Sequence, residues 1–213
     1  MLRQFKWSRS ALLGVMIGAA GLVTVPCNAE AADDQSVTEQ AASDLPSAKQ
    51  TSLGLYVTSK EAYEEWQAAP DDVTIIDVRT PEEFIFIGHP EMALNIPIAT
   101  QSLVWDTEKQ QFPMKITSDF VARVQQIANP DDKLLVMCRS GGRSAIAVNM
   151  LAKAGFKNVY NITDGMEGDS VKDPNSVYQG QRLVNGWKNS GMPWTYKVKP
   201  DQVLLPAAPP AGK

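Results

Sequence analysis

The segment from residue 134 to residue 144 constrains the fold of this chain more than any other. An apolar run, LLVM, leads directly into Cys138, and a short loop with two glycines and two arginines follows. Good helix formers then extend from Ser144 to Ala154, where Gly155 can close the helix. A buried strand that passes into a helix through a tight loop is typical of parallel α/β sheets. This pattern places Cys138 at the carboxyl end of the strand, where such sheets bind ligands.

The same alternation of short apolar runs and helical segments extends along the chain from residue 51 to residue 197. The pattern predicts strands at 56–57, 73–78, 93–98, 133–137 and 158–162. It predicts helices at 58–69, from Pro81 onwards, at 118–128, at 144–154 and at 183–189. Residues 99–116 are of mixed composition, and we expect a loop or short helices there. Alternating strands and helices predict an α/β fold, with a mostly parallel sheet covered by helices on both faces.

Residues 1–29 have the three parts of a secretory signal peptide. Arg3, Lys6 and Arg9 form a basic start, residues 11–25 are apolar and uncharged, and small residues precede a cleavage point after Ala29. The apolar stretch is shorter than the roughly 20 residues of a bilayer-spanning helix. We therefore predict a periplasmic or secreted protein with no membrane association after cleavage. A retained membrane anchor is the alternative.

Two further segments flank the predicted domain at 51–197. Residues 30–50 are rich in Ala, Asp, Gln and Ser and predict a flexible leader, while residues 198–213 predict an extended tail rich in Pro and Ala. The formal charge is −4 for the full chain and −7 without residues 1–29, because that segment holds three basic and no acidic side chains. An acidic chain lacks the cationic surface that nucleic acids and anionic membranes require, so neither is an expected partner.

Removal of the signal peptide would leave Cys138 as the only cysteine. A single thiol in an exported protein indicates either an intermolecular disulfide or a free and reactive group. Several features would stabilise its thiolate form: the helix N-terminus, a backbone nest made by Gly141 and Gly142, and the side chains of Arg139 and Arg143. We expect that a bulky residue at either glycine would obstruct the close approach of the backbone, and that the pocket is positively lined.

The spacing between Cys138 and Arg143 separates two kinds of chemistry. Cysteine-based phosphatases have five residues between the nucleophile and the arginine, whereas four lie between them here and Ser144 comes next. The tighter loop favours a sulfur atom over a phosphate group. A phosphatase or arsenate reductase is therefore the weakest of the alternatives.

Four motifs, in this order, resemble those of the rhodanese family. They are IIDVRTPEEF at 75–84, Gly88-His89 with ALNIP at 93–97, CRSGGR at 138–143, and AGFKNVYNI at 154–162 followed by DGM at 164–166. The resemblance spans residues 53–196. It implies a single rhodanese-like domain with a parallel five-stranded sheet flanked by helices on both faces. The chain departs from the family at Pro90-Glu91-Met92, at Asp164-Gly165 and in a longer loop at 167–186, which we expect to shape the pocket.

The resemblance also implies roles for individual residues. The catalytic residue would be Cys138, which would carry a persulfide. The substrate-binding residues would be Arg139, Ser140, Gly141, Gly142 and Arg143. The structural residues near the site would be Asp77, Arg79 and Ser144. We expect Asp77 and Arg79 to pair with each other or with the backbone, and His89, the only histidine, to be a structural hydrogen-bonding residue.

The predicted function is that of a sulfurtransferase. It would move sulfane sulfur from a donor such as thiosulfate to a thiol, a cyanide-like acceptor or an acceptor protein, through a persulfide on Cys138. Neither a cofactor nor a metal is expected. The alternative is a rhodanese-like binding or regulatory module with weak catalytic activity.

Overall fold

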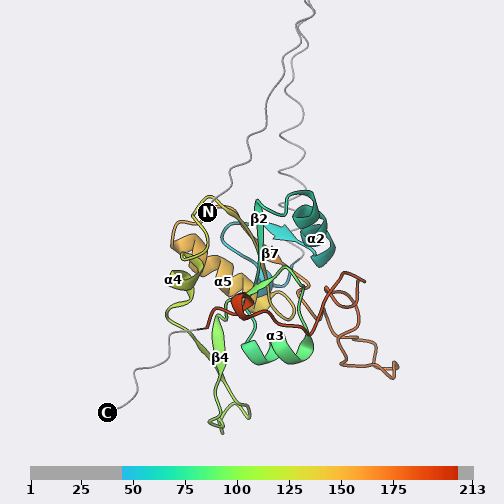
Figure 1. Ribbon diagram of the computed structural model, residues 1–213. Helices are drawn as coiled ribbons and strands as arrows, with labels where there is room; N and C mark the ends of the chain where they lie inside the picture. The colour runs from blue at the N-terminus through green and yellow to red at the C-terminus, as the bar shows by residue number, and fades with distance from the viewer. Residues whose placement is uncertain (1–44, 206–213) are drawn as a thin grey trace, which may run out of the picture.

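The computed structural model describes residues 45–205, so the predicted signal peptide, most of the predicted leader and residues 206–213 lie outside the described residues. Its centre is a five-stranded sheet in the order β1-β7-β6-β2-β3, in which every pair of neighbours is parallel (Figure 1). The strands are β1 Tyr56–Val57, β2 Val73–Asp77, β3 Leu94–Asn95, β6 Lys133–Met137 and β7 Val159–Ile162. The predicted α/β fold with a parallel five-stranded sheet is confirmed.

Helices connect the strands, and two of them begin at capping boxes supplied by the sequence. They are α2 Ser59–Ala68, α3 Pro81–Ile87, α4 Phe120–Val124 and α5 Gly142–Lys153, with short 3-10 turns η1 Ser47–Lys49 and η2 Pro200–Gln202. Thr58 and Glu61 form a capping box before α2, and Thr80 and Glu83 form one before α3. Gly155 follows α5 with a φ of 95°, a conformation that favours glycine at the end of a helix.

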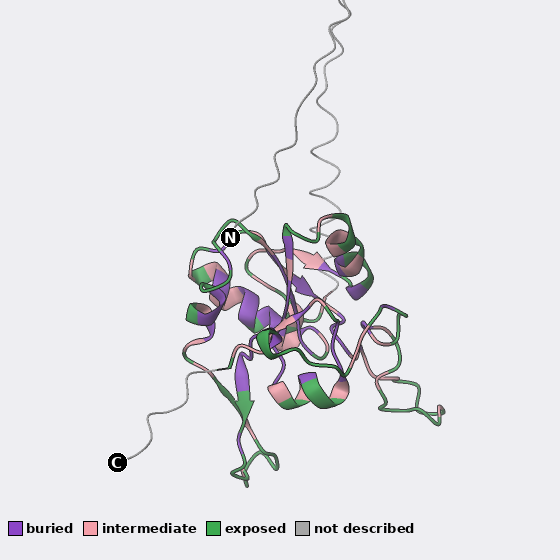
Figure 2. Ribbon diagram, viewed as in Figure 1, coloured by how far each residue is buried: buried purple, intermediate pink, exposed green. Residues whose placement is uncertain are grey.

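Apolar side chains of β6 point alternately into two cores, one on each face of the sheet. Leu134 and Val136 pack with α4 and α5, whereas Leu135 and Met137 pack with α2 and α3. Figure 2 shows this buried interior, and Figure 1 shows α4 and α5 on the opposite side of the sheet from α2. Both faces of β6 are covered, which explains why its sequence is continuously apolar.

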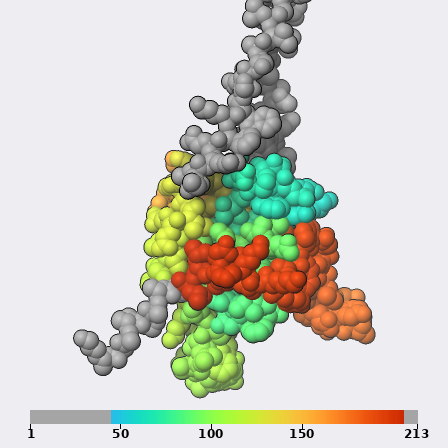
Figure 3. Space-filling view, viewed as in Figure 1, coloured from blue at the N-terminus to red at the C-terminus, as the bar shows by residue number. Residues whose placement is uncertain are grey.

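The prediction of a loop or short helices at 99–116 was wrong. This segment forms an antiparallel hairpin of β4 Ala99–Gln101 and β5 Met114–Ile116, in which Ala99 pairs with Ile116. The hairpin projects away from the sheet (Figures 1 and 3). Five of its six strand residues are not buried, so the segment has no alternation of buried and exposed positions that would mark it as β-structure.

The predicted helix at 183–189 is also absent, and α4 is shorter than the predicted 118–128. Residues 184–186 form bends and residues 187–189 a turn. The Asn185 side chain accepts a hydrogen bond from the backbone N–H of Asp169, and the Gly186 N–H donates to the carboxylate of Asp164. Gly186 has a φ of 92°, which no helix accommodates. These long-range contacts replace the local helical hydrogen bonds.

Both ends of the domain reach further than the sequence pattern indicates. Lys49, in the segment predicted to be a flexible leader, forms an ion pair of 3.0 Å with Asp169. In the segment predicted to be a tail, the Leu204 N–H donates to the carbonyl of Asn95 at 2.8 Å. Figure 3 shows the C-terminal segment lying across one face of the molecule. Within residues 45–205, no helix is long and apolar enough to cross a membrane.

Candidate active site

Cys138 lies directly after β6, at the carboxyl edge of the sheet, with only 2% of its surface exposed. Its Sγ accepts hydrogen bonds from the backbone N–H of Gly141 at 3.2 Å and from the hydroxyl of Ser144 at 3.3 Å. Both donors belong to the start of α5, whose N-terminal end carries a partial positive charge. The strand–loop–helix segment therefore brings Cys138, Gly141 and Ser144 together as the spacing indicated, and Ser144 contacts the sulfur itself.

Only one of the two loop glycines is required by the fold. Gly141 has a φ of 94°, and a Cβ built there would overlap the carbonyl oxygen of Thr163. A Cβ at Gly142 would meet nothing nearer than the carbonyl oxygen of Ala48 at 3.7 Å, an ordinary contact. The overlap at Gly141 agrees with the expectation that a bulky residue there would obstruct the backbone. At Gly142 a methyl group fits, and the expectation for a bulky residue at that position stays a prediction.

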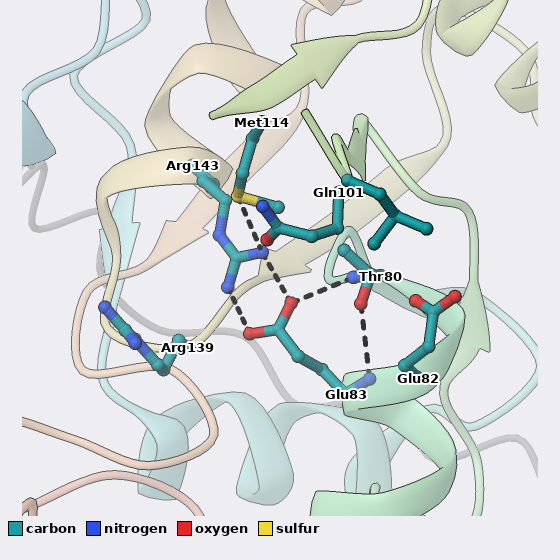
Figure 4. Close-up of a pocket in the computed structure, with 8 residues that line it drawn as sticks. Thr80, Glu82, Glu83, Gln101, Met114, Arg139 and Arg143 are labelled. Carbon is teal, nitrogen blue, oxygen red and sulfur yellow. Dashed lines mark hydrogen bonds and ion pairs between the residues drawn. The ribbon is translucent and has the colours of Figure 1, made fainter. Parts of the chain in front are cut away.

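Arg143 is held by Glu83 of α3 (Figure 4). Nη1 donates to Oε2 and Nη2 donates to Oε1 of the carboxylate, both at 2.6 Å, and Nη1 lies 3.8 Å from the sulfur of Met114. Burial alone would raise the pKa of the Glu83 carboxyl, but the hydrogen bonds and charge of Arg143 hold that pKa below its ordinary value. Burial would lower the pKa of Arg143, but Glu83 and, to a smaller extent, Cys138 raise it.

A pocket of about 680 Å³ opens beside this ion pair. The residues that line it are Thr80, Glu82, Glu83, Gln101, Leu103, Met114, Arg139 and Arg143. Three of them, Gln101, Leu103 and Met114, belong to the β4–β5 hairpin or its tip, so this segment forms one wall. Two acids and two arginines line the pocket, so the expected positive lining was wrong, because the charges of Glu82 and Glu83 balance those of the arginines.

Asp77 and Arg79 lie at the end of β2 and are fully buried. Nη2 of Arg79 lies 2.6 Å from Oδ2 of Asp77 in an ion pair. The same Nη2 also donates a hydrogen bond to the carbonyl oxygen of Gly88 at 2.8 Å. The amide of Asn95 donates to the carbonyls of both Asp77 and Arg79. These contacts fix the turn between β2 and α3, and they thereby position Glu83 at the start of α3.

His89 is fully buried and stacks on Phe84, with ring centroids 3.7 Å apart. Its Nδ1 lies 3.0 Å from the carbonyl oxygen of Phe84 and donates to it. Burial lowers the pKa of the imidazole, which favours the neutral ring. The histidine therefore holds the end of α3 against the turn that follows.

Two residues that build this site, Glu83 and Asp164, are not among the site residues predicted from the sequence. Glu83 lies in the first turn of α3, and its partner Arg143 lies 60 positions away in the sequence. Asp164 is buried, and its carboxylate accepts hydrogen bonds from Ser59 and from the N–H of Gly186. Each pairing depends on chain segments that only the fold brings together.

A parallel α/β domain with a thiol cradled at a strand–helix junction defines a class of cysteine-loop domains. Comparison with known protein families narrows this class. Residues 59–170, more than half of the chain, match the rhodanese-like domain family. This chain belongs to the rhodanese-like family.

Three similar proteins show how far this relationship extends. An uncharacterized protein of Rickettsia prowazekii is 31% identical over 122 residues, which cover 57% of this chain and 82% of that protein. Thiosulfate sulfurtransferase 16, chloroplastic, of Arabidopsis thaliana is 36% identical over 90 residues, covering 42% and 68% of the two chains. The crystal structure of Rv0390 from M. tuberculosis is 25% identical, covers 66% of this chain and 96% of its own, and superposes with a TM-score of 0.51. Some members of the family are thus thiosulfate sulfurtransferases.

Proposed function

We propose that this protein is a sulfurtransferase whose nucleophile is Cys138. The observation that carries the proposal is the pair of donors on its sulfur, the Gly141 N–H at 3.2 Å and the Ser144 hydroxyl at 3.3 Å, at the N-terminus of α5. Hydrogen-bond donors and a helix N-terminus are placed to stabilise the negative charge that sulfur carries when it attacks a donor. The same donors can stabilise the terminal sulfur of a persulfide.

The reaction follows from this arrangement in two displacements. The Cys138 thiolate attacks the outer sulfur of thiosulfate, a new S–S bond forms, the S–S bond of thiosulfate breaks, and sulfite leaves with the electron pair. The thiolate of an acceptor then attacks the outer sulfur of the Cys138 persulfide, and the Cys138 thiolate is released. Neither step requires an external oxidant or reductant. In this proposal Arg139, Ser140, Gly141, Gly142 and Arg143 surround the donor.

Mass spectrometry of the intact protein tests this function. After incubation with thiosulfate and removal of excess donor, we expect the mass of one additional sulfur atom on Cys138, which is the only free cysteine among residues 45–205. An acceptor thiol should then remove it. The Cys138→Ser variant is the control and should gain no sulfur. An unmodified wild-type protein, or equal modification of the variant, would refute the mechanism.

The hairpin favours a second candidate function, that of a protein-binding module. Leu103, Val104, Phe112 and Ile116 of this segment are exposed, beside a pocket that opens to the surface. Exposed apolar side chains grouped beside a pocket are typical of interaction sites. The sulfur-loading experiment distinguishes the two candidates. A protein that gains no sulfur on Cys138, but binds a partner from its own compartment through the hairpin, would be a module.

We also propose that the chain is exported to the periplasm or secreted after cleavage near Ala29. The tripartite pattern at 1–29 supports this proposal. Cell fractionation, combined with the mass of the mature N-terminus, tests it. A protein that retains Met1 in the cytoplasmic fraction would exclude export.

A further inference from the structure

The two arginines of the loop differ in how they are engaged. Arg143 directs both terminal nitrogens of its guanidinium at the carboxylate of Glu83, with 2.6 Å for each hydrogen bond. Only about a fifth of either side chain is exposed, 19% for Arg143 and 23% for Glu83. Such a two-point pair uses the same nitrogens that would bind two oxygens of an oxyanion.

Arg139 lines the same pocket but differs from Arg143 in its exposure and in its ion pairing. It is exposed, and it forms no ion pair with any side chain of residues 45–205. Figure 4 shows its guanidinium apart from the Arg143–Glu83 pair. As far as residues 45–205 show, the pocket therefore offers one guanidinium without an ion pair to an incoming anion instead of two.

We propose that Glu83 is a specificity-determining residue of this site: by occupying both terminal nitrogens of Arg143, it disfavours donors with two negative charges relative to donors with one. The inference rests on the proposed sulfur transfer and names the class of donor, a singly charged organic sulfane compound. Arg139 is the cation that meets the donor's charge. Leu103 and Met114 of the hairpin wall provide apolar contact for an organic group.

A pair of donors tests this proposal, because they differ in charge but react in the same way. Thiosulfate carries two negative charges, whereas benzenethiosulfonate carries one and also brings an apolar ring. For the wild type we expect a higher kcat/KM with benzenethiosulfonate. In Glu83→Gln, Arg143 is released from its ion pair, and we expect KM for thiosulfate to fall about tenfold, which corresponds to about 1.4 kcal/mol. We expect kcat to stay the same and KM for benzenethiosulfonate to change less.

Glu82→Gln is the matched control. Glu82 lines the same pocket and is exposed, and it forms no ion pair among residues 45–205. Its substitution changes the pocket charge by the same amount but releases no guanidinium, so we expect a smaller fall in KM for thiosulfate. Equal effects of the two variants would mean that total charge matters rather than the Arg143 pair, and would overturn the proposal. A rise in KM for thiosulfate in Glu83→Gln, or a fall in kcat alone, would show that Glu83 aligns Arg143 for transfer instead.

A second variant guards against a loss of folding, and a binding measurement tests the role of Glu83 independently of sulfur transfer. The Gln carbonyl can still accept the Thr80 N–H that Glu83 accepts at 3.0 Å, so the cap of α3 is retained. Should Glu83→Gln not fold, Glu83→Asp shortens the side chain so that it no longer spans both nitrogens, and KM for thiosulfate should fall part of the way. Calorimetric titration of thiosulfate into Cys138→Ser, with and without Glu83→Gln, measures anion affinity without any sulfur transfer. Tighter binding in the double variant is expected, and unchanged binding would refute the role of Glu83 even if the wild type accepts sulfur.

Discussion

The two adjacent glycines of the loop after Cys138 differ in how strictly their positions require glycine. Gly141 combines a positive φ with backbone of Thr163 where a Cβ would lie, and its N–H is one of the two donors to the thiol sulfur. Gly142 is the first residue of α5, and a Cβ there would make only an ordinary contact with the carbonyl oxygen of Ala48. Only at Gly141, therefore, do backbone strain, steric overlap of a Cβ and a hydrogen bond to the thiol sulfur coincide.

Substitution of each glycine by alanine tests this difference. We expect Gly141→Ala to lower the free energy of unfolding by about 2–4 kcal/mol, through left-handed backbone strain and the overlap with Thr163, and to abolish sulfur loading of Cys138. Gly142→Ala should leave stability unchanged or raise it by up to about 1 kcal/mol, because alanine favours the helix. Urea denaturation and intact-mass analysis measure both effects. Equal destabilisation by the two substitutions would contradict this account.

At the scale of elements, the β4–β5 hairpin is the part of the site that local patterns did not predict. The strand–loop–helix at 134–154 was predictable because apolar continuity, two glycines and a helix-forming segment all lie within one stretch. The hairpin depends instead on pairing Ala99 with Ile116 and on an N–H of Ser102 that donates to Pro113. Exposure of most of its side chains removes the periodicity on which such predictions rest.

The hairpin wall should select among acceptors. We expect Leu103→Ser to lower kcat/KM about fivefold for a tripeptide with cysteine between two leucines, because about 1 kcal/mol of apolar contact is lost. A tripeptide with cysteine between two serines should be affected little. Unfolding free energy should change by less than about 0.5 kcal/mol, as for other exposed positions. Steady-state kinetics with the two peptides measures the preference.

Val177→Ser provides the control for that experiment. Val177 is 86% exposed and Leu103 is 88% exposed, but Val177 does not line the pocket. We expect its substitution to leave the preference between the two peptides unchanged. A loss of preference in both variants, or in neither, would show that the hairpin does not select the acceptor.

At the scale of the whole molecule, global stability should depend on pH through a single imidazole. His89 is the only histidine of the chain, and burial lowers its pKa in the folded state. The unfolded chain therefore takes up a proton at a higher pH, near 6.5, than the folded protein does. The stabilising contribution is complete above that pH and is lost as the pH falls towards the lowered folded pKa.

Urea denaturation between about pH 7.5 and pH 5.5 tests this dependence, since ordinary carboxyl groups titrate near pH 4. We expect the unfolding free energy of the wild type to decrease on acidification by up to about 1.4 kcal/mol per pH unit. His89→Gln should be less stable at neutral pH but should show a nearly flat profile. A flat wild-type profile would mean that the buried ring accepts a proton without cost.

The central position of β6 has a consequence for how the thiol responds to thermal fluctuations. β6 forms backbone hydrogen bonds with β2 on one side and with β7 on the other. β1 and β3, by contrast, are edge strands of two residues each. Edge strands open in small, frequent excursions, but a central strand loses its amide protection only when the sheet opens as a whole. In hydrogen exchange, the amides of β6 should thus be among the slowest. Because Cys138 directly follows β6, we expect its sulfur to stay in place while the edge strands fluctuate.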